Sequence, residues 1–444
     1  MQANRVLRMV SPITEWCVGP PLVGGPNSGW AAARRQAPAL HHPRLSGLAA
    51  LAVLGLLAGC VTPVSPAPRV TAAGLTPEQA AREERNLRIF DTVWSTVAQR
   101  YYEPKLHGVD WRTAAITYGP QATAAADEMA LYGAVNGLLG LLGDGHTGAF
   151  TAAQARDYHT QQHEMTGIRI LRLGQRWAVY EVLPGSPAES AGVKPGWIVL
   201  SRDGQPLGER LQLPSLRGGE VVRWEFLDGR DQPVVLALTA ARVSVARQEA
   251  RVLPGGFVYL RFDDFYWSRM RWLSRQLKAH RDAPGVVIDL RQNPGGMLFS
   301  LDLMTGELFD RGFVYAESID RSGGRHRLWA LTLGSAHYRG RVAILVSRVS
   351  ASAAEIFAAT IQERHRGTVV GHQTAGYVLS ARMRSLPDGG MLEYSDRDLH
   401  MTDGRRLEGC GVTPDVVPPP LTLDDLRAGR DPDLDAAVRV LRQP

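Results

Sequence analysis

Four short apolar runs in the C-terminal half most strongly constrain how this chain can fold. They are "GFVYLRF" (256–262), "GVVIDL" (285–290), "RVAILVS" (341–347) and "GTVVGH" (367–372). None of them alternates apolar with polar residues, and such runs are typical of strands buried on both faces of a sheet. Helical stretches such as "MRWLSRQLKAH" and "SAAEIFAATIQERH" separate them. Residues 244–430 are therefore predicted to form an α/β domain, with a C-terminal tail over 431–444.

Two further regions precede this domain, as the length of 444 residues allows. Residues 165–243 contain short strand patterns separated by Gly and Asp turns, including "RWAVYEVL" and "VVRWEFLDG". Residues 76–160 have helical periodicity, and Thr76, Pro77 and Gln79 form a helix-start signal with capping-box spacing. The sequence thus predicts a multidomain α/β protein with an N-terminal helical region.

The N-terminus contains a targeting signal. "RLSGLAALAVLGLLAGC" has a basic flank and an apolar core too short for a comfortable membrane span, as in a signal peptide. Its ending "LAGC" resembles a bacterial lipobox, which implies lipidation of Cys60. We therefore expect an upstream segment and signal peptide over 1–59, a Pro-rich tether over 60–75, and a periplasmic lipoprotein. Val61 favours the outer membrane, since an aspartate there suggests inner-membrane retention. An ordinary signal peptide or a buried helix is the alternative.

Composition disfavours several classes of function. The net charge of +6 comes without a clustered basic face, so nucleic-acid binding is not expected. The histidines and cysteines lack metal-ligand spacing, so no metal or other cofactor is predicted. Contact with a membrane is expected through the lipid anchor only, and the sequence does not determine the oligomeric state.

Two segments could carry chemistry. In "VVIDLRQNPGGM" a buried strand ends in a turn at Gly295 and Gly296, where backbone N–H groups can closely approach an oxyanion. In "SASAAEIF" a helix is expected to begin after Ser352, so the Ala353 amide and the helix dipole would favour negative charge there. The alternative is that Ser350 or Ser352 only caps the helix.

Together, "IDLRQNPGG", "SASAAEIFAATIQERHRGTVVGHQTAG" and "LEGCGVTPDVVP" resemble the C-terminal-processing, or tail-specific, serine peptidase family. The likeness covers most of residues 76–420. It implies a ClpP/crotonase-like catalytic core and endopeptidase activity on protein or peptide substrates. It also implies that Ser352 is the nucleophile and that Gly295, Gly296 and Ala353 form the oxyanion hole.

Residues 165–243 resemble a PDZ domain, chiefly through "SPAESAGVKPGWIVLSRDGQPL". A PDZ domain adds a peptide as a strand to a sheet edge and captures its C-terminal carboxylate with backbone amides. The resemblance implies that Met165, Thr166, Gly167 and Ile168 bind peptide segments or C-termini. The alternative is a structural β-domain that binds nothing.

The base departs from the common family pattern. Typical members have a lysine 25 positions after the serine, where this chain has Tyr377. All three lysines precede residue 279, which excludes that Ser-Lys dyad. Tyrosine, with an ordinary pKa near 10, is a poor base at neutral pH, whereas histidine is suited to the role. The histidine candidates include His146, His365, His372 and His400.

A second branch of the family, resembling the tricorn protease core, uses serine, histidine and glutamate. Its motifs are matched here by "DGHT" (144–147) and "EGCGVTP" (408–414). The resemblance implies that His146 is the base and that Glu408 orients it, with His372 as a competing base and Asp144 as another orienting carboxylate. The rival functions are a non-catalytic peptide- or ligand-binding adaptor and, with less support, an acyl-CoA hydratase-like crotonase.

Overall fold

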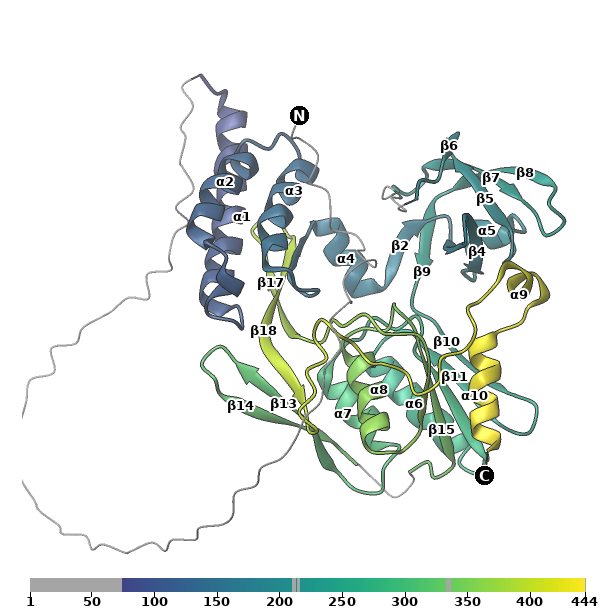
Figure 1. Ribbon diagram of the computed structural model, residues 1–444. Coiled ribbons are helices and arrows are strands. Elements are labelled where there is room, and N and C mark those ends of the chain that lie inside the picture. The colour runs from purple at the N-terminus through teal and green to yellow at the C-terminus, as the bar shows by residue number, and fades with distance from the viewer. Residues whose placement is uncertain (1–73, 210–212, 214–215, 333–336, 444) are drawn as a thin grey trace, which may run out of the picture.

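The computed structural model describes residues 74–209, 213, 216–332 and 337–443. These residues form a helical region, a small β-domain and an α/β core (Figure 1). Cys60, the segment 1–59 and nearly all of the tether lie outside the described residues. Among the described helices, none has both the length and the apolar character that a membrane crossing requires.

The core is built on a five-stranded sheet of order β10-β11-β12-β15-β16, in which only β10 is antiparallel to its neighbour. Side chains from α6, α7 and α8 pack with Val286 and Ile288 on one face, whereas Val287 packs with α10 on the other. The bounds are β10 (Gln248–Val252), β11 (Val258–Phe262), α6 (Trp267–Ala279), β12 (Gly285–Asp289), α7 (Leu298–Gly306), β15 (Arg341–Val346), α8 (Ala353–Glu363), β16 (Thr368–Gly371) and α10 (Pro432–Arg442).

The four apolar runs are confirmed as β11, β12, β15 and β16, and β12 is buried along its whole length. Within the segment 431–444, which we expected to be a tail, Pro432–Arg442 forms α10, whose apolar face is buried against the sheet. Arg291, directly after β12, ties α10 to the core. Its guanidinium bonds to Asp289 (2.7 Å), Asp431 (2.8 Å) and Asp433 (3.2 Å).

A second sheet joins the helical region to the core. It has the order β1-β18-β13-β14, with β17 also paired to β18. The helices pack on it through a shared apolar cluster that includes Leu392 and Tyr394 of β18. The bounds are α1 (Pro77–Arg100), α2 (Trp111–Thr123), α3 (Glu128–Leu139), β1 (Gly148–Phe150), α4 (Ala152–Thr160), β13 (Phe313–Asp320), β14 (Arg325–Ala330), β17 (Ser380–Ser385) and β18 (Met391–Met401). Because β1 directly follows "DGHT", this sheet also positions that loop.

The β-domain is a sheet of order β3-β4-β5-β7-β8, with β6 paired to β5 and one short helix, α5. The two-stranded ribbon of β2 and β9 lies where the chain enters and leaves it. Glu181 of β4 bonds to Arg169 and Arg261, which links the domain to β11. The bounds are β2 (Gln162–Met165), β3 (Ile168–Leu173), β4 (Arg176–Val182), α5 (Pro187–Ser190), β5 (Ile198–Arg202), β6 (Gln205–Pro206), β7 (Val221–Leu227), β8 (Pro233–Thr239) and β9 (Ala241–Ser244).

Candidate active site

Ser352 lies at the junction between the segment that follows β15 and the first turn of α8. Its backbone has φ 54° and ψ −121°, a conformation that non-glycine residues rarely adopt. Its N–H donates to the carbonyl of Tyr377 at 2.7 Å, which helps to hold the turn. Backbone strain of this kind costs roughly 1–3 kcal/mol and is concentrated at functional sites, so the geometry favours more than a capping role.

The Gly295-Gly296 turn directly contacts Ser352. A Cβ added to Gly295 would lie 2.6 Å from the Cβ of Ser352, and Gly295 has φ +107°. Asn293, which is fully buried, holds this turn against the serine segment. Its Oδ1 accepts the Gly295 N–H at 2.8 Å, and its backbone carbonyl accepts the N–H of Ala351 at 3.1 Å.

The predicted oxyanion donors are therefore not equivalent. The N–H of Gly295 is already bonded to Asn293. In the described part of the chain, no hydrogen bond uses the N–H of Gly296 or of Ala353. A built Cβ at Gly295 would lie 3.0 Å from the Ala353 nitrogen, so the turn and the helix start are adjacent. Gly296 and Ala353 are thus the two amides available as donors, and Gly295 shapes the turn.

Gly295→Ala is expected to lower kcat by about 10²-fold or more, because the added methyl group displaces the turn that carries Gly296, a predicted oxyanion donor. The measurement is kcat for a fluorogenic peptide. Gly404→Ala is the matched control, since Gly404 also has positive φ (+88°) but open space around it. If both variants lose activity equally, backbone strain is the cause, and the proposed clash is wrong.

Glu355 ties the Ser352 turn to the loop that follows β16. Its carboxylate is fully buried and accepts hydrogen bonds from the Ser352 N–H (3.1 Å), the Thr374 hydroxyl (2.5 Å), the Gly376 N–H (2.8 Å) and the Tyr377 N–H (2.9 Å). Burial raises the pKa of Glu355 to about 7, opposed by these donors. The sequence motifs did not single out Glu355, although a glutamate in an otherwise apolar helix start is a visible signal.

Tyr377 connects the "DGHT" loop to the serine. Its backbone bonds to Ser352 and Glu355, while its ring lies against Gly145, where a built Cβ would be 2.2 Å from the ring. Burial, and next to it the charge of Glu408, raise the pKa of Tyr377. The phenol therefore stays protonated at neutral pH and is unsuited to act as the base. Tyr377 thus contacts both the "DGHT" loop and the Ser352 turn.

His146 lies in this loop and is partly buried. Its Nδ1 is shielded from solvent without a hydrogen-bond partner. Burial lowers the pKa of His146, opposed by the charge of Asp144, so the imidazole is neutral at neutral pH. The Asp144 carboxylate accepts from the N–H groups of His146 (2.9 Å) and Thr147 (2.7 Å) and from the Tyr101 hydroxyl (2.6 Å). Asp144 thus shapes the loop and leaves the ring of His146 unbonded.

Glu408 approaches from the "EGCGVTP" segment. Its Oε2 accepts the N–H groups of Val378 (2.7 Å) and Leu379 (3.2 Å), so it lies beside Tyr377. Burial raises the pKa of Glu408. In the described residues no hydrogen bond joins Glu408 to His146. Glu408 and the loop that carries His146 therefore both lie beside Tyr377, but Glu408 and His146 are not hydrogen-bonded to each other.

The other candidate histidines are directed elsewhere. The Nε2 of His372 lies 3.7 Å from Asp433 of α10. The Nε2 of His400 lies 3.1 Å from the carboxylate of Asp398. His365 is exposed just beyond α8. Of these four histidines, His146 is the one whose loop packs against the ring of Tyr377, the residue whose carbonyl accepts the Ser352 N–H.

The residues predicted to bind peptide lie between β2 and β3. The carbonyls of Thr166 and Gly167 accept the N–H groups of Ala188 (3.0 Å) and Leu183 (2.9 Å). Gly167 has φ +86°, and a Cβ there would lie 2.1 Å from that of Ser186. Met165 ends β2, whereas Ile168 begins β3, which is an edge strand of its sheet. Among the described residues, no strand pairs with the outer edge of β3.

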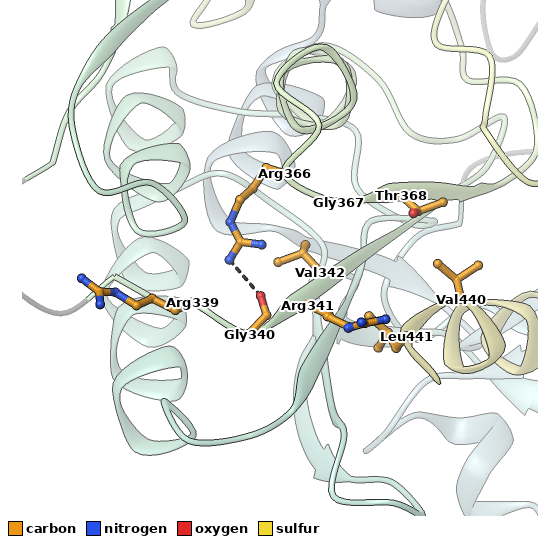
Figure 2. Close-up of a pocket in the computed structure, with 9 residues that line it drawn as sticks. All are labelled: Arg339, Gly340, Arg341, Val342, Arg366, Gly367, Thr368, Val440 and Leu441. Atoms are coloured by element: carbon orange, nitrogen blue, oxygen red, sulfur yellow. Dashed lines mark hydrogen bonds between the residues drawn. The ribbon is translucent and has the colours of Figure 1, made fainter. Parts of the chain in front are cut away.

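A pocket of about 260 Å³ lies away from these residues (Figure 2). Arg366 spans part of it and donates to the carbonyl of Gly340 at 3.0 Å. The pocket is at the amino ends of β15 and β16, whereas Ser352 and the Gly295-Gly296 turn follow the carboxyl ends of β15 and β12. Its lining residues are Arg339, Gly340, Arg341, Val342, Arg366, Gly367, Thr368, Val440 and Leu441.

Comparison with known proteins agrees with this organisation. Residues 256–417 match the sequence profile of peptidase family S41, and residues 82–139 match that of the tricorn protease C1 domain. The chain is 26% identical over 388 residues to a carboxyl-terminal-processing protease of Synechocystis sp., covering 83% of this chain and 89% of the relative. It is 23% identical over 355 residues to a probable CtpA-like serine protease of Staphylococcus epidermidis, covering 78% of this chain and 67% of the relative.

The solved structure of a photosystem II D1 C-terminal processing protease has a similar fold, with a TM-score of 0.53 and 22% identity over 83% of this chain and 98% of that one. The S41 match and the carboxyl-terminal-processing relatives identify a serine-type peptidase. Residues 256–417 thus carry a peptidase family S41 domain, and the chain is similar to CtpA-like carboxyl-terminal-processing proteases.

Proposed function

We propose that this protein is an endopeptidase in which Ser352 is the nucleophile, His146 the base and Glu408 the group that orients the base. The observation that carries the proposal is the contact of both the "DGHT" loop and the Ser352 turn with Tyr377. The N–H groups of Gly296 and Ala353 serve as oxyanion donors. The missing lysine is then a change of base, and the site is not degenerate.

In the proposed reaction, the Ser352 hydroxyl attacks the peptide carbonyl while His146 takes its proton. The negative charge on the carbonyl oxygen is stabilised by the two amides and by the start of α8. The tetrahedral adduct collapses when His146 returns the proton to the leaving amine, which gives an acyl-enzyme. A water molecule then attacks the acyl-enzyme while His146 takes its proton. His146 returns that proton to the Ser352 oxygen, and the new carboxylate is released. An imidazole that acts as the base needs a hydrogen-bond partner at Nδ1, and the Nδ1 of His146 has none in this structure. We propose that Glu408 becomes this partner when substrate binds.

A fluorophosphonate probe tests the proposal. The full-length protein is expected to be labelled, with the adduct mapped to the peptide containing Ser352, and labelling is expected to abolish cleavage of casein. An unlabelled protein that does not cleave casein would contradict the catalytic proposal and favour a binding role.

We also propose that residues 165–243 act as a PDZ domain that binds substrate segments or C-termini along β3. The open edge of β3 and the free N–H groups of Thr166 and Gly167 in the described structure support this. A contact connects this domain to the active site. Gln292, in the turn before Gly295, accepts from the Tyr180 hydroxyl at 3.0 Å.

Gln292→Ala is expected to lower kcat on a short peptide by about 2- to 10-fold, because one net hydrogen bond that positions the oxyanion turn is lost. KM for the same peptide should change little. Tyr180→Phe removes the nearer donor to Gln292, to which Arg169 also donates at 3.5 Å, and should reproduce most of the effect. If Tyr180→Phe behaves like the wild type while Gln292→Ala loses activity, the contact between the domains is not the cause.

The envelope location is a proposal from sequence, since Cys60 lies outside the described residues. Cys60→Ser is expected to move the protein from the membrane fraction to the soluble periplasmic fraction, because acyl chains supply the anchoring energy. Fractionation and mass spectrometry of the mature N-terminus measure this. A variant that stays in the membrane fraction would show that another element anchors the chain.

A further inference from the structure

A buried hydroxyl from the helical region reaches the loop of the proposed base. Tyr101 directly follows α1, is fully buried, and donates its hydroxyl hydrogen to Asp144 at 2.6 Å. The other donors to the Asp144 carboxylate are the N–H groups of His146 and Thr147 and the Thr147 hydroxyl, which belong to the "DGHT" loop itself. In the described part of the chain, Tyr101 is therefore the one donor that ties this carboxylate to another element.

The backbone around Tyr101 is held on both sides. Its N–H donates to the Val97 carbonyl at 3.1 Å, and its carbonyl accepts from the guanidinium of Arg321 at 2.7 Å. The N–H of the next residue, Tyr102, donates to the Ser395 carbonyl of β18 at 3.0 Å. The ring of Tyr101 is thus fixed to both the helical region and the second sheet before it contacts Asp144.

The direction of the bond from Tyr101 to Asp144 is also fixed. A phenol has one proton, and an ionised carboxylate can only accept, so the proton lies toward Asp144. The Nε2 of His107 lies 3.1 Å from the Tyr101 oxygen, and it must be the donor in that contact because the phenol proton is already committed. Burial, and next to it the charge of Asp144, raise the pKa of Tyr101, so the phenol keeps this proton at neutral pH.

The imidazole of His146 has no such support of its own. Its Nδ1 is buried without a partner, so the position of the ring is set by the backbone of its loop. That backbone is bonded to Asp144 through the N–H groups of His146 and Thr147, and Gly145 packs against the ring of Tyr377. The Tyr101 bond therefore acts on the one group that organises the loop backbone.

We propose that Tyr101 is a positioning residue for the reaction, which acts through Asp144 to hold the "DGHT" loop where His146 serves the Ser352 hydroxyl. This rests on the proposed function, because the position of the loop affects the rate only if His146 is the base. Tyr101 touches neither substrate nor reacting atoms in this role. Its contribution is to keep the base in place between turnovers.

A double-mutant cycle with His146 tests this role. Tyr101→Phe is expected to lower kcat on a fluorogenic peptide by about 10- to 100-fold with little change in KM, because a small displacement of a catalytic group costs rate. In the His146→Ala background, the same substitution is expected to change kcat by less than about 2-fold, because residues that act as one unit are not additive. Each kcat is expressed per folded molecule, from thermal unfolding of the same preparation.

Tyr132→Phe is the matched control. Tyr132 is also buried in the apolar cluster of the helical region, and its hydroxyl donates to the Asp388 carboxylate at 3.1 Å. Its removal deletes the same kind of bond away from the "DGHT" loop, so kcat should stay within about 2-fold of the wild type after the same loss of a hydrogen bond.

Asp144→Asn examines the bond from its other end and keeps the test decisive if Tyr101→Phe does not fold. The asparagine can still accept the loop N–H groups through Oδ1 but presents an N–H to Tyr101. It should lower kcat, again only when His146 is present. Wild-type kcat in Tyr101→Phe, or an equal loss with and without His146, would overturn the positioning role and leave the proposed function standing. A His146→Ala variant with wild-type activity would overturn the proposed base and the positioning role together.

Discussion

Ser352→Ala is expected to lower kcat for peptide cleavage by at least about 10³-fold and to abolish fluorophosphonate labelling, because no other group can form the acyl-enzyme. The fold should persist, since the serine backbone makes the bonds that hold the turn: its N–H donates to Tyr377 and Glu355. Residual turnover, kcat and thermal stability are measured on the same preparation. A modest loss in kcat would contradict the role of Ser352.

Ser350→Ala is the matched control for this variant. The Ser350 hydroxyl is buried and donates to the Leu290 carbonyl at 2.8 Å, while it accepts the Ser347 N–H at 2.9 Å. Its removal is expected to cost roughly 1–3 kcal/mol of unfolding free energy and to leave labelling in place. The opposite result, with labelling lost in Ser350→Ala and retained in Ser352→Ala, would exchange the two roles.

His146→Ala is expected to lower kcat/KM by about 10²- to 10⁴-fold, the usual contribution of a general base. His372→Ala should retain most activity, because its ring is directed toward Asp433. If only His372→Ala loses activity, the assignment of the base is wrong. Ester substrates with good leaving groups provide a second readout, since they depend less on protonation of the leaving group and should be less sensitive to the His146 substitution.

The pH dependence follows from the same residue. A base must be neutral, so activity should fall as pH decreases through the pKa of His146, which burial holds below its ordinary value of 6.5. The acidic limb of kcat/KM should therefore lie below pH 6.5. Glu355 titrates nearby, at about 7, so the profile is repeated in Glu355→Gln. A limb that persists in that variant belongs to His146, and a limb that disappears belongs to Glu355.

The parts of this site that sequence could predict are local. The apolar runs marked the strands because burial on both faces leaves no polar position, and the glycines and serine follow those strands directly. Glu355 was not predicted because its importance comes from four donors, and three of them follow β16 in the Thr374–Tyr377 loop. The ordinary pKa of tyrosine already argued against Tyr377 as a base, and burial raises that pKa further, but its contact with Gly145 depends on tertiary structure.

The second sheet was harder to predict. Strand β18 has the sequence "MLEYSDRDLHM". It pairs with β1, β17 and β13 along different parts of its length. Its polar residues therefore do not follow the two-residue alternation by which a strand is recognised in sequence. That pairing positions the "DGHT" loop more than two hundred residues upstream of Ser352. Whether the base could reach the serine was therefore a question of sheet topology, which spacing along the chain cannot answer.

The ion pairs of Arg291 have a consequence for biosynthesis. The arginine that precedes the oxyanion turn receives two of its carboxylate partners, Asp431 and Asp433, from positions 140 and 142 residues later. During translation, the turn therefore remains without this support until α10 has emerged, long after the nucleophile has been made. A chain that is interrupted before residue 431 would contain all three proposed catalytic residues but would lack two of the carboxylates that hold Arg291 beside the Gly295-Gly296 turn.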